Sequence, residues 1–275
     1  MPAAGSRPAF VEPETVELGL EGKVAIVTGA SRGIGAAIAR ELGREGCALS
    51  LSARSLDALG TLAEDLRAGG SRVLVRAGDL READEPAQLI EATLAELGRL
   101  DVVVANAGAT KRGDFLALRD EDWQDGFALK LFAHVRLIRA AWPHLVETGG
   151  SVLSIAGVGG RTPGAEFAIG GSVNAAILSL GKALAARGVA DGVQVNVVNP
   201  GPIRTDRLRT RIRTAAESDG VDDEEAALRL AAELGVARFG EPEEVASLVA
   251  YVVSPRGRFL HGALIDVDGG QTRTI

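Results

Sequence analysis

The chain has 275 residues, of which 46% are hydrophobic and 24% charged, and its formal net charge is -7. This length and apolar content suit one large α/β domain with a buried core. The negative charge provides no general attraction to nucleic acid or to an anionic membrane surface, so we expect neither partner. The first residues lack a cationic segment followed by an apolar run, so we expect a cytoplasmic protein without a signal peptide or membrane span.

Cysteine and histidine usage argues against disulfide and metal chemistry. The single cysteine, Cys47, cannot form an internal disulfide, and its apolar flanks predict a small buried thiol at the start of a strand. The three histidines, His134, His144 and His261, are too scattered to form a ligand cluster. We therefore predict no metal site.

The chain alternates short apolar runs with helix-length amphipathic segments, which is the pattern of βαβ units. We predict strands at residues 23–28, 48–53, 72–77, 101–105, 150–155, 193–198 and 263–267. The helices predicted between them span residues 35–45, 56–68, 84–97, 120–142, 172–187 and 242–253. The expected fold is a Rossmann-type, doubly wound α/β fold, with a seven-stranded parallel sheet and helices on both faces.

A glycine-rich turn joins the first predicted strand to the first predicted helix. It reads Thr28-Gly29-Ala30-Ser31-Arg32-Gly33-Ile34-Gly35. Glycines let the backbone approach a pyrophosphate closely, and the N–H groups at the start of the helix receive the negative charge. Its spacing, Gly-x-x-x-Gly-x-Gly, differs from the Gly-x-Gly-x-x-Gly dinucleotide fingerprint. The turn predicts a nucleotide phosphate site at the end of the first strand.

Four further motifs follow the glycine turn in order. They are Asp79-Leu80 after the third strand, Asn106-Ala107-Gly108 after the fourth, Asn199-Pro200-Gly201-Pro202-Ile203-Arg204-Thr205 after the sixth, and Asp268-Gly269-Gly270 near the end. With these motifs, the chain from Gly22 onward resembles the short-chain dehydrogenase/reductase family. The resemblance implies a nicotinamide-dependent oxidoreductase acting on an unknown small molecule, with residues 1–21 as an N-terminal extension and 22–275 as one dinucleotide-binding domain.

The resemblance also implies which residues bind the cofactor. Those for the pyrophosphate and adjacent ribose are Gly29, Ser31, Arg32, Gly33, Ile34 and Gly35. Asp79 and Leu80 would border the adenine, and Asn106, Ala107 and Gly108 the ribose near the sheet centre, with Asn174 in the place of a ribose-binding lysine. The nicotinamide would contact Pro200, Gly201, Ile203 and Thr205. Read singly, the Asn106 motif is equally a tight strand end and Pro200-Gly201 an ordinary turn.

The end of the second strand favours NADP(H) over NAD(H). It reads Ser52-Ala53-Arg54-Ser55 and lacks the acidic residue that accepts a hydrogen bond from a free 2′-hydroxyl. Arg54, with Ser55 beside it, and Arg32 offer groups suited to a 2′-phosphate. The alternative is that either arginine is merely solvated.

The resemblance further implies a catalytic tetrad: an asparagine on the helix 120–142, a serine after the fifth strand, and a Tyr-x-x-x-Lys pair on the next helix. The tyrosine gives a proton to the carbonyl oxygen as hydride arrives. The matching positions in this chain hold Lys130, Gly157, Gly170 and Asn174. The only tyrosine is Tyr251, on a later helix, and Phe167, the aromatic residue nearest the tyrosine position, has no proton to give. Ordinary tyrosine-dependent carbonyl reduction is therefore not expected.

Lys130 is the one change at these positions that adds chemistry. Its ammonium group would either reach the ribose or a substrate oxygen, as a catalytic residue, or fill vacated volume as a structural lysine hydrogen-bonded to Asn174. His134 lies one helical turn further on, where we expect a packed or interface histidine. Lys111 and Arg112 follow the Asn106 turn on a loop that either borders the substrate cavity or is simply solvated.

Residues 204–238 lie where the family keeps a mobile lid over the substrate. The segment starts with basic residues, including Arg207 and Arg209, and continues with acidic ones. It would either steer an anionic substrate or form a helix pair with charged, solvated faces, and we favour the helix pair because the charges largely cancel.

Two functional classes remain open. One is a non-standard hydride-transfer enzyme, and the other is a non-catalytic NADP(H)-binding sensor or the inactive subunit of an assembly. Family members commonly pair through the helices that correspond to 120–142 and 172–187, so we expect a homo-dimer or homo-tetramer.

Overall fold

The computed structural model describes residues 17–274, and all statements below concern these residues. A seven-stranded sheet lies at the centre, with the strand order β3-β2-β1-β4-β5-β6-β7 and every neighbouring pair parallel. The strands are β1 (Val24–Thr28), β2 (Ala48–Ala53), β3 (Val73–Ala77), β4 (Val102–Ala105), β5 (Ser151–Ile155), β6 (Gln194–Pro200) and β7 (Leu264–Val267).

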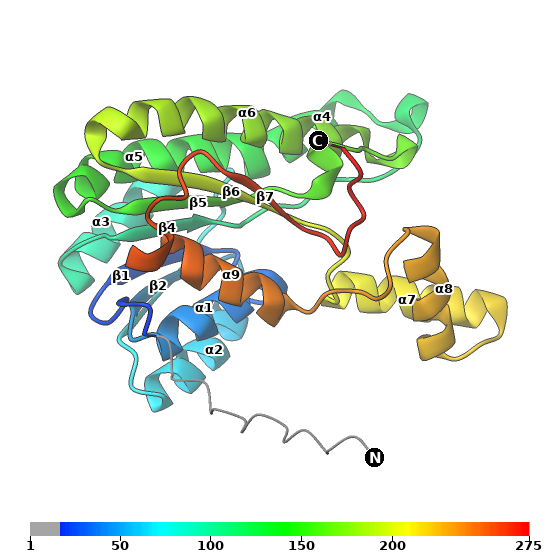
Figure 1. Cartoon of the computed structure of the whole chain (residues 1–275), viewed down its shortest axis with the longest axis horizontal. Coiled ribbons are helices and arrows are strands. Elements are labelled where there is room, and N and C mark those ends of the chain that lie inside the picture. The colour runs from blue at the N-terminus through cyan, green and yellow to red at the C-terminus, as the bar shows by residue number, and fades with distance from the viewer. Residues whose placement is uncertain (1–16, 275) are drawn as a thin grey trace, which may run out of the picture.

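Helices cover both faces of the sheet (Figure 1). One face carries α1 (Gly33–Arg44), α2 (Leu56–Ala68) and α9 (Pro242–Val253), whose apolar residues form one large core with β1 and β2. The other face carries α3 (Glu85–Leu97), α5 (Ala133–Thr148) and α6 (Ala168–Asp191). The predicted doubly wound α/β fold is confirmed, because apolar strands buried on both faces need a helical layer on each side.

The order of the strands reverses next to β1. The chain adds β2 and β3 on one side of β1, and then returns to add β4 on the other side. In such sheets the loops that follow the two strands diverge and leave a crevice at the carboxyl ends, where ligands bind. The Gly29 turn after β1 and the Asn106 loop after β4 therefore lie at the place where a ligand site is expected.

The helix predicted at residues 120–142 is three elements in the structure. A short α4 (Asp120–Gly126) leads into a π-helical segment, η2 (Phe127–Phe132), and α5 continues from there to Thr148. The apolar spacing of the sequence did not reveal this change of winding. π-Helical segments are rare in proteins and frequently lie at functional sites. This one carries Lys130.

The helix α6 begins at Ala168, before the predicted start at residue 172. Gly170 and Gly171 therefore lie within the helix. In the fold both glycines are needed for close packing. A Cβ atom at Gly171 would lie 2.6 Å from Pro163 Cβ, and one at Gly170 would overlap the ring of Phe167.

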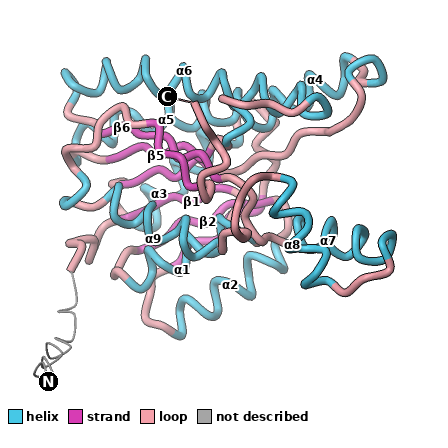
Figure 2. The backbone as a smooth tube through the Cα atoms, turned by 45° about the vertical axis from the view of Figure 1, so that its right-hand side comes forward, coloured by secondary structure: helices cyan, strands magenta, loops and turns pink. Residues whose placement is uncertain are grey.

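A separate helix pair, α7 (Asp206–Asp219) and α8 (Asp223–Glu233), projects from the body of the molecule (Figures 1 and 2). It has a small apolar core of its own, in which Ile212, Ala226 and Phe239 are buried. The helix pair predicted for residues 204–238 is therefore present.

The proposed N-terminal extension, residues 1–21, falls mostly outside the described residues. Its last part belongs to the packed domain, because Leu20 is buried in the core and Leu18 packs against it. Cys47 is buried as predicted. Its thiol donates a hydrogen bond to Leu20 O at 3.5 Å, and burial raises its pKa to about 12.

One segment, Ala165–Asp191, is long and apolar enough to cross a membrane by length and composition alone, with a mean hydropathy of 1.4. In the fold it contains α6, whose inner residues Val173, Ile177 and Leu178 form a core with Val197 of β6. The apolar character of α6 is therefore explained, along that face, by the packing of a helix on a sheet.

Candidate functional site

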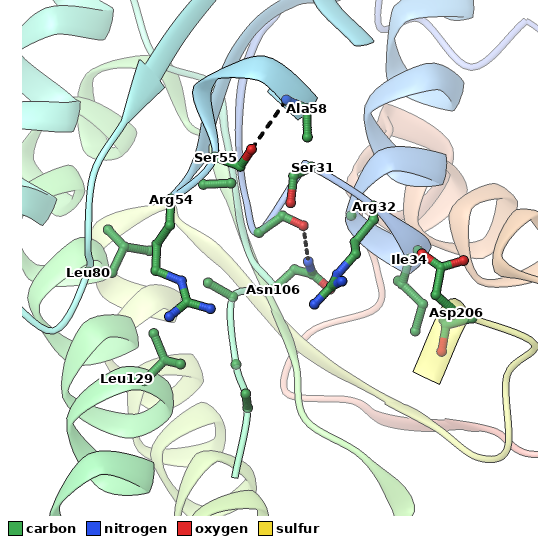
Figure 3. A pocket seen from close by; sticks show the side chains of 18 of the residues that line it. Ser31, Arg32, Ile34, Arg54, Ser55, Ala58, Leu80, Asn106, Leu129 and Asp206 are labelled. Atoms are coloured by element: carbon green, nitrogen blue, oxygen red, sulfur yellow. Dashed lines mark hydrogen bonds between the residues drawn. The ribbon is translucent and has the colours of Figure 1, made fainter. Parts of the chain in front are cut away.

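A cavity of about 840 Å³ opens at the carboxyl ends of the strands, between the turn after β1 and the loop after β4 (Figure 3). Its wall combines segments that are far apart in the sequence. The predicted cofactor residues that line it are Gly29, Ser31, Arg32, Gly33, Ile34, Gly35, Arg54, Ser55, Asp79, Leu80, Asn106, Ala107, Gly108 and Thr205. The other lining residues are Ala53, Ala58, Gly78, Ala109, Leu129 of the π-helical segment, and Asp206 and Thr210 of α7.

The glycine turn requires glycine for two reasons. Gly29 has a φ of +66°, in the left-handed region that favours glycine. At Gly35 a Cβ atom would lie 2.6 Å from Asn106 Nδ2, too close for any side chain. The turn delivers the chain into α1, whose first turn contains no acidic residue within the described sequence. The open N–H groups and the positive end of this helix suit a phosphate group.

A hydrogen-bond network fixes the floor of the cavity. Thr28 Oγ1 accepts hydrogen bonds from Asn106 N at 3.0 Å and from Ala107 N at 3.1 Å. Asn106 Nδ2 donates to Thr28 O at 2.9 Å. The Asn106 amide therefore locks the end of β4 to the end of β1. The Asn106 motif therefore forms both a tight strand end and the floor of the cavity.

Two arginine side chains, Arg32 and Arg54, point into the cavity (Figure 3). Asp79 brings a carboxylate to the same wall, but it pairs with Arg81 at 3.1 Å. Burial by itself would raise the Asp79 pKa, whereas hydrogen bonds from Arg81 and the charges of Arg81 and Arg54 outweigh burial and lower the pKa. Arg81 also pairs with Asp125 on α4. The sequence analysis missed Arg81, whose position two residues after Asp79 was the available signal.

Four predicted cofactor residues, Asn174, Pro200, Gly201 and Ile203, do not line this cavity. Gly201 has a structural role, since a Cβ atom there would lie 2.7 Å from Asp268 Cα, and Gly201 N donates to Val267 O at 3.0 Å. The Pro200-Gly201 turn thus fits closely against the Asp268-Gly269-Gly270 motif.

Lys130 lies against the loop after β4, beside the cavity, but is not part of its lining. Its aliphatic chain lies over Gly108, where a Cβ atom would be 2.8 Å from Lys130 Cδ. Its Nζ donates a hydrogen bond to Ala156 O at 2.9 Å. As a structural lysine, Lys130 was expected to form a hydrogen bond with Asn174. In the structure its Nζ instead donates to the loop after β5.

Asn174 and Gly157 lie against one another. Gly157 has a φ of +152°, and a Cβ atom there would lie 3.0 Å from Asn174 Nδ2. The Asn174 side chain therefore occupies the space beside Gly157. Asn174 is 2% exposed, and its Oδ1 atom has no hydrogen-bond partner among the described residues. A buried carbonyl oxygen of this kind is costly unless a ligand or water donates to it.

The ring of Phe167 fills the space beside Gly170. It also lies against Gly159, where a Cβ atom would be 2.7 Å from Phe167 Cε1. The guanidinium carbon of Arg112 lies over the same ring, 4.1 Å from its centroid. Gly113 N donates to Glu166 O at 3.0 Å, which holds the loop after β4 against the segment before α6.

The sequence analysis named Phe167 and Arg112 but did not pair them. The glycines at 159 and 170 were the available signal for an aromatic ring between them. Lys111, next to Arg112, instead forms an ion pair with Asp122 at 2.8 Å, as expected for a solvated loop.

His134 is a packed histidine, 1% exposed, and neither of its ring nitrogens has a hydrogen-bond partner among the described residues. Burial, and then the charge of Lys130, lower its pKa to about 3, so the imidazole is neutral at ordinary pH. No group of three or more His, Cys, Asp or Glu side chains within residues 17–274 could hold a metal ion.

Comparison with known proteins identifies the class. The family model described as enoyl-(acyl carrier protein) reductase matches residues 29–272. An uncharacterized oxidoreductase of Mycobacterium tuberculosis, MT0954, is 36% identical over 255 residues, covering 92% of this chain and 93% of the relative. The chain therefore belongs to the short-chain dehydrogenase/reductase family.

Solved structures of family members match the whole fold. L-sorbose reductase of Gluconobacter frateurii, solved with NADPH and L-sorbose, is 32% identical with a TM-score of 0.91, over 94% of this chain and 100% of that one. A short-chain oxidoreductase of Pseudomonas aeruginosa PAO1, described as containing an atypical catalytic centre, is 27% identical with a TM-score of 0.88, over 94% of this chain and 100% of that one.

Proposed function

We propose that the protein binds NADP(H) and transfers hydride to or from a small molecule by a route that does not use the usual Asn-Ser-Tyr-Lys tetrad. The observation that carries the cofactor assignment is a pair of arginines whose side chains point into the cavity: Arg32 in the turn after β1 and Arg54 at the end of β2. The similarity to an L-sorbose reductase solved with NADPH supports it.

The residues of the cavity fit a phosphorylated dinucleotide. The glycine turn and the start of α1 would hold the pyrophosphate, because they offer backbone N–H groups and no side-chain bulk. Arg32, Arg54 and Ser55 would bind the 2′-phosphate, with Arg54 held beside the adenine wall at Asp79 and Leu80. Asn174 Oδ1, buried without a partner in the described structure, would accept from a ribose hydroxyl.

When bound, the cofactor supplies or accepts the hydride. The chain must then provide or remove a proton, and Gly157 and Gly170 have no group that can do so. Lys130 holds an ammonium at 2.9 Å from Ala156 O, next to Gly108 at the end of the cavity. We assign to Lys130 the transfer of a proton to the substrate oxygen.

The alternative is a non-catalytic NADP(H)-binding sensor or an inactive subunit. The position of Phe167 favours it, because an aromatic ring without a titratable group fills the space beside Gly170. We further propose that the protein is cytoplasmic and forms a homo-dimer or homo-tetramer, and that α7 and α8 act as a lid, since Asp206 and Thr210 of α7 line the cavity.

Calorimetric titration with NADPH, NADP⁺, NADH and NAD⁺ tests the cofactor assignment. NADPH and NADP⁺ should bind about tenfold more tightly than NADH and NAD⁺, or better. A tenfold ratio is a difference in binding free energy of about 1.4 kcal/mol. Arg54→Ala should reduce this preference, whereas Arg44→Ala, on the far end of α1, should not. Equal binding of all four nucleotides would reject the 2′-phosphate site.

Turnover separates the enzyme from the sensor. NADPH consumption is measured with a panel of small carbonyl compounds. If Lys130 transfers the proton, Lys130→Met should lower kcat by about a hundredfold or more while NADPH affinity stays unchanged. Unchanged kcat in Lys130→Met would leave Lys130 with a structural role only. Tight NADPH binding without turnover by the wild-type protein would support the sensor.

A further inference from the structure

A second cavity, of about 450 Å³, adjoins the cofactor cavity. The two share part of their lining, including Arg32, Thr205 and Asp206. The second cavity extends from there between α1, α2, α7 and the start of α9. Arg40 of α1 and Arg209 of α7 line this cavity but not the first. Its volume lies in the range of small-molecule pockets, so it has room for a ligand of its own.

Guanidinium groups outnumber carboxylates in the wall of the second cavity. The arginines that line it are Arg32, Arg40, Arg204 and Arg209. The carboxylates that line it are those of Asp206 and Glu243. The whole chain has a formal net charge of -7, so this wall is opposite in sign to the molecule as a whole. A local excess of cations of this kind attracts a small anion to the cavity.

The ion pairs of these arginines leave most of their N–H donors available. Arg40 meets Asp65 through Nη2 at 3.5 Å, and Arg209 meets Asp206 through Nη1 at 3.7 Å. Both pairs are long and exposed, and such surface pairs stabilise a protein little. Arg204 pairs with Glu241 through Nε alone, at 3.1 Å. A guanidinium has five N–H donors, so each of these arginines can still donate to the oxygens of a ligand.

The starts of three helices add to this positive field. The first residues of α1, α7 and α9, which are Gly33, Asp206 and Pro242, all line the second cavity. The positive ends of the three helix dipoles therefore lie at its wall, where they favour a negative charge. A phosphate group matches the guanidinium groups best, because its oxygens accept paired N–H donors from the planar fork of an arginine.

We propose that the second cavity binds a small molecule that carries a phosphate group, held by Arg40, Arg204 and Arg209, at a site separate from the cofactor. Arg204 and Arg209 belong to the segment that leads into and begins α7, whereas Arg40 belongs to α1. A phosphate bound between them joins the α7–α8 pair to the body of the molecule and stabilises that arrangement. The site does not depend on the cofactor assignment, since neither Arg40 nor Arg209 lines the cofactor cavity.

Calorimetry with inorganic pyrophosphate as the probe, at constant ionic strength, tests the inference. The protein is first saturated with NADPH to fill the cofactor cavity, and pyrophosphate should still bind at a single site. Arg40→Met and Arg209→Met should each weaken this binding by about tenfold or more, because charge-assisted hydrogen bonds are lost. Glu243→Gln should strengthen it by about threefold, because the change removes a negative charge from the wall.

Arg44→Met and Arg211→Met are the matched controls, because they remove the same charge from α1 and α7 at positions outside the cavity lining. Both should leave pyrophosphate affinity within about twofold of the wild type. Complete displacement of pyrophosphate by NADPH would overturn the inference. Equal losses in the control and the cavity variants, or no gain in Glu243→Gln, would also overturn it.

Arg54→Met separates this site from the cofactor site, because Arg54 lines the first cavity alone. It should lower NADPH affinity and leave the affinity of the second cavity for pyrophosphate unchanged. If NADPH does not bind to the wild-type protein, the proposed function is rejected. Pyrophosphate is then titrated into Arg54→Met protein without nucleotide, and the Arg40→Met and Arg209→Met changes made in that background still decide on the second cavity.

Discussion

The space beside Gly170 is occupied by a neighbouring side chain. The family resemblance predicts a tyrosine at this position, and in this fold the ring of Phe167 takes up the space in front of the glycine. The two positions are three residues apart: Phe167 is the N-cap residue that precedes α6, and Gly170 lies in its first turn. A tyrosine introduced at position 170 would therefore have to compete with the Phe167 ring for space.

Gly170→Tyr should destabilise the protein by about 1–3 kcal/mol, because the new side chain overpacks against Phe167. The loss is measured by urea unfolding. Adding Phe167→Ala should recover part of it, since the second change removes the obstructing ring, although Phe167→Ala alone opens a cavity. A double variant no more stable than Gly170→Tyr would show that the clash lies with another group.

The start of β1 and the start of β4 are joined by one carboxylate. Asp101 accepts hydrogen bonds from Val24 N at 3.0 Å, from Arg99 Nη2 at 2.7 Å and from Lys23 Nζ at 3.2 Å. Burial would raise the Asp101 pKa, but the hydrogen bonds from Arg99 and Val24 N–H and the Lys23 charge outweigh it and lower the pKa. The Asp101 carboxylate therefore links β1 to β4, which are distant in the sequence, and it does so in its ionised form.

Asp101→Asn should reduce the free energy of unfolding by about 1–3 kcal/mol at neutral pH, because the buried Val24 N–H and the partly exposed cations of Lys23 and Arg99 lose a charged acceptor. A carboxyl group with a lowered folded-state pKa stabilises the fold above its unfolded pKa, about 4, and loses that effect as pH falls through the folded value. The difference between wild type and variant should therefore be full above about pH 5 and shrink below pH 4. A constant difference from pH 7 to pH 3 would contradict this account.

The α7–α8 pair has an apolar core of its own, and its basic first helix carries exposed Arg209, Arg211 and Arg213. If the pair closes over the bound cofactor, as proposed, NADPH should slow tryptic cleavage within α7 by about threefold or more, because cleavage requires local opening. Cleavage is followed by mass spectrometry, with NADH as the comparison nucleotide. Equal cleavage with and without saturating NADPH would reject the proposal that α7 and α8 form a lid.

At the scale of the whole molecule, α6 exposes several apolar residues on the side away from the sheet. Ala175, Ala183 and Ala186 are exposed there beside Ser179 and Lys182, and Val189 is 75% exposed. A helix face with small apolar residues and few charges is suited to packing against a second subunit. It is consistent with the proposed homo-oligomer.

Val189→Lys should weaken the oligomer, because burying an unpaired charge at an interface is costly. Light scattering after size exclusion measures the mass. Leu228→Lys on α8, where the leucine is 58% exposed, is the matched control and should leave the mass unchanged. A wild-type protein that is monomeric at all concentrations, or a Val189→Lys protein of unaltered mass, would reject the α6 interface.

The sequence alone determined the fold, its seven strands and the glycine-rich turn after β1, because these depend on local patterns: apolar runs of strand length and glycines within one short turn. It also indicated Arg54 at the end of β2 and Arg32 in the turn after β1. The tertiary structure decided what surrounds Lys130, Gly157, Gly170 and Asn174. The partner of Lys130, the ring beside Gly170 and the stacking of Arg112 bring together loops after β4 and β5 with the start of α6. Contacts between such distant segments follow from side-chain volume and backbone winding, which a residue pattern does not encode.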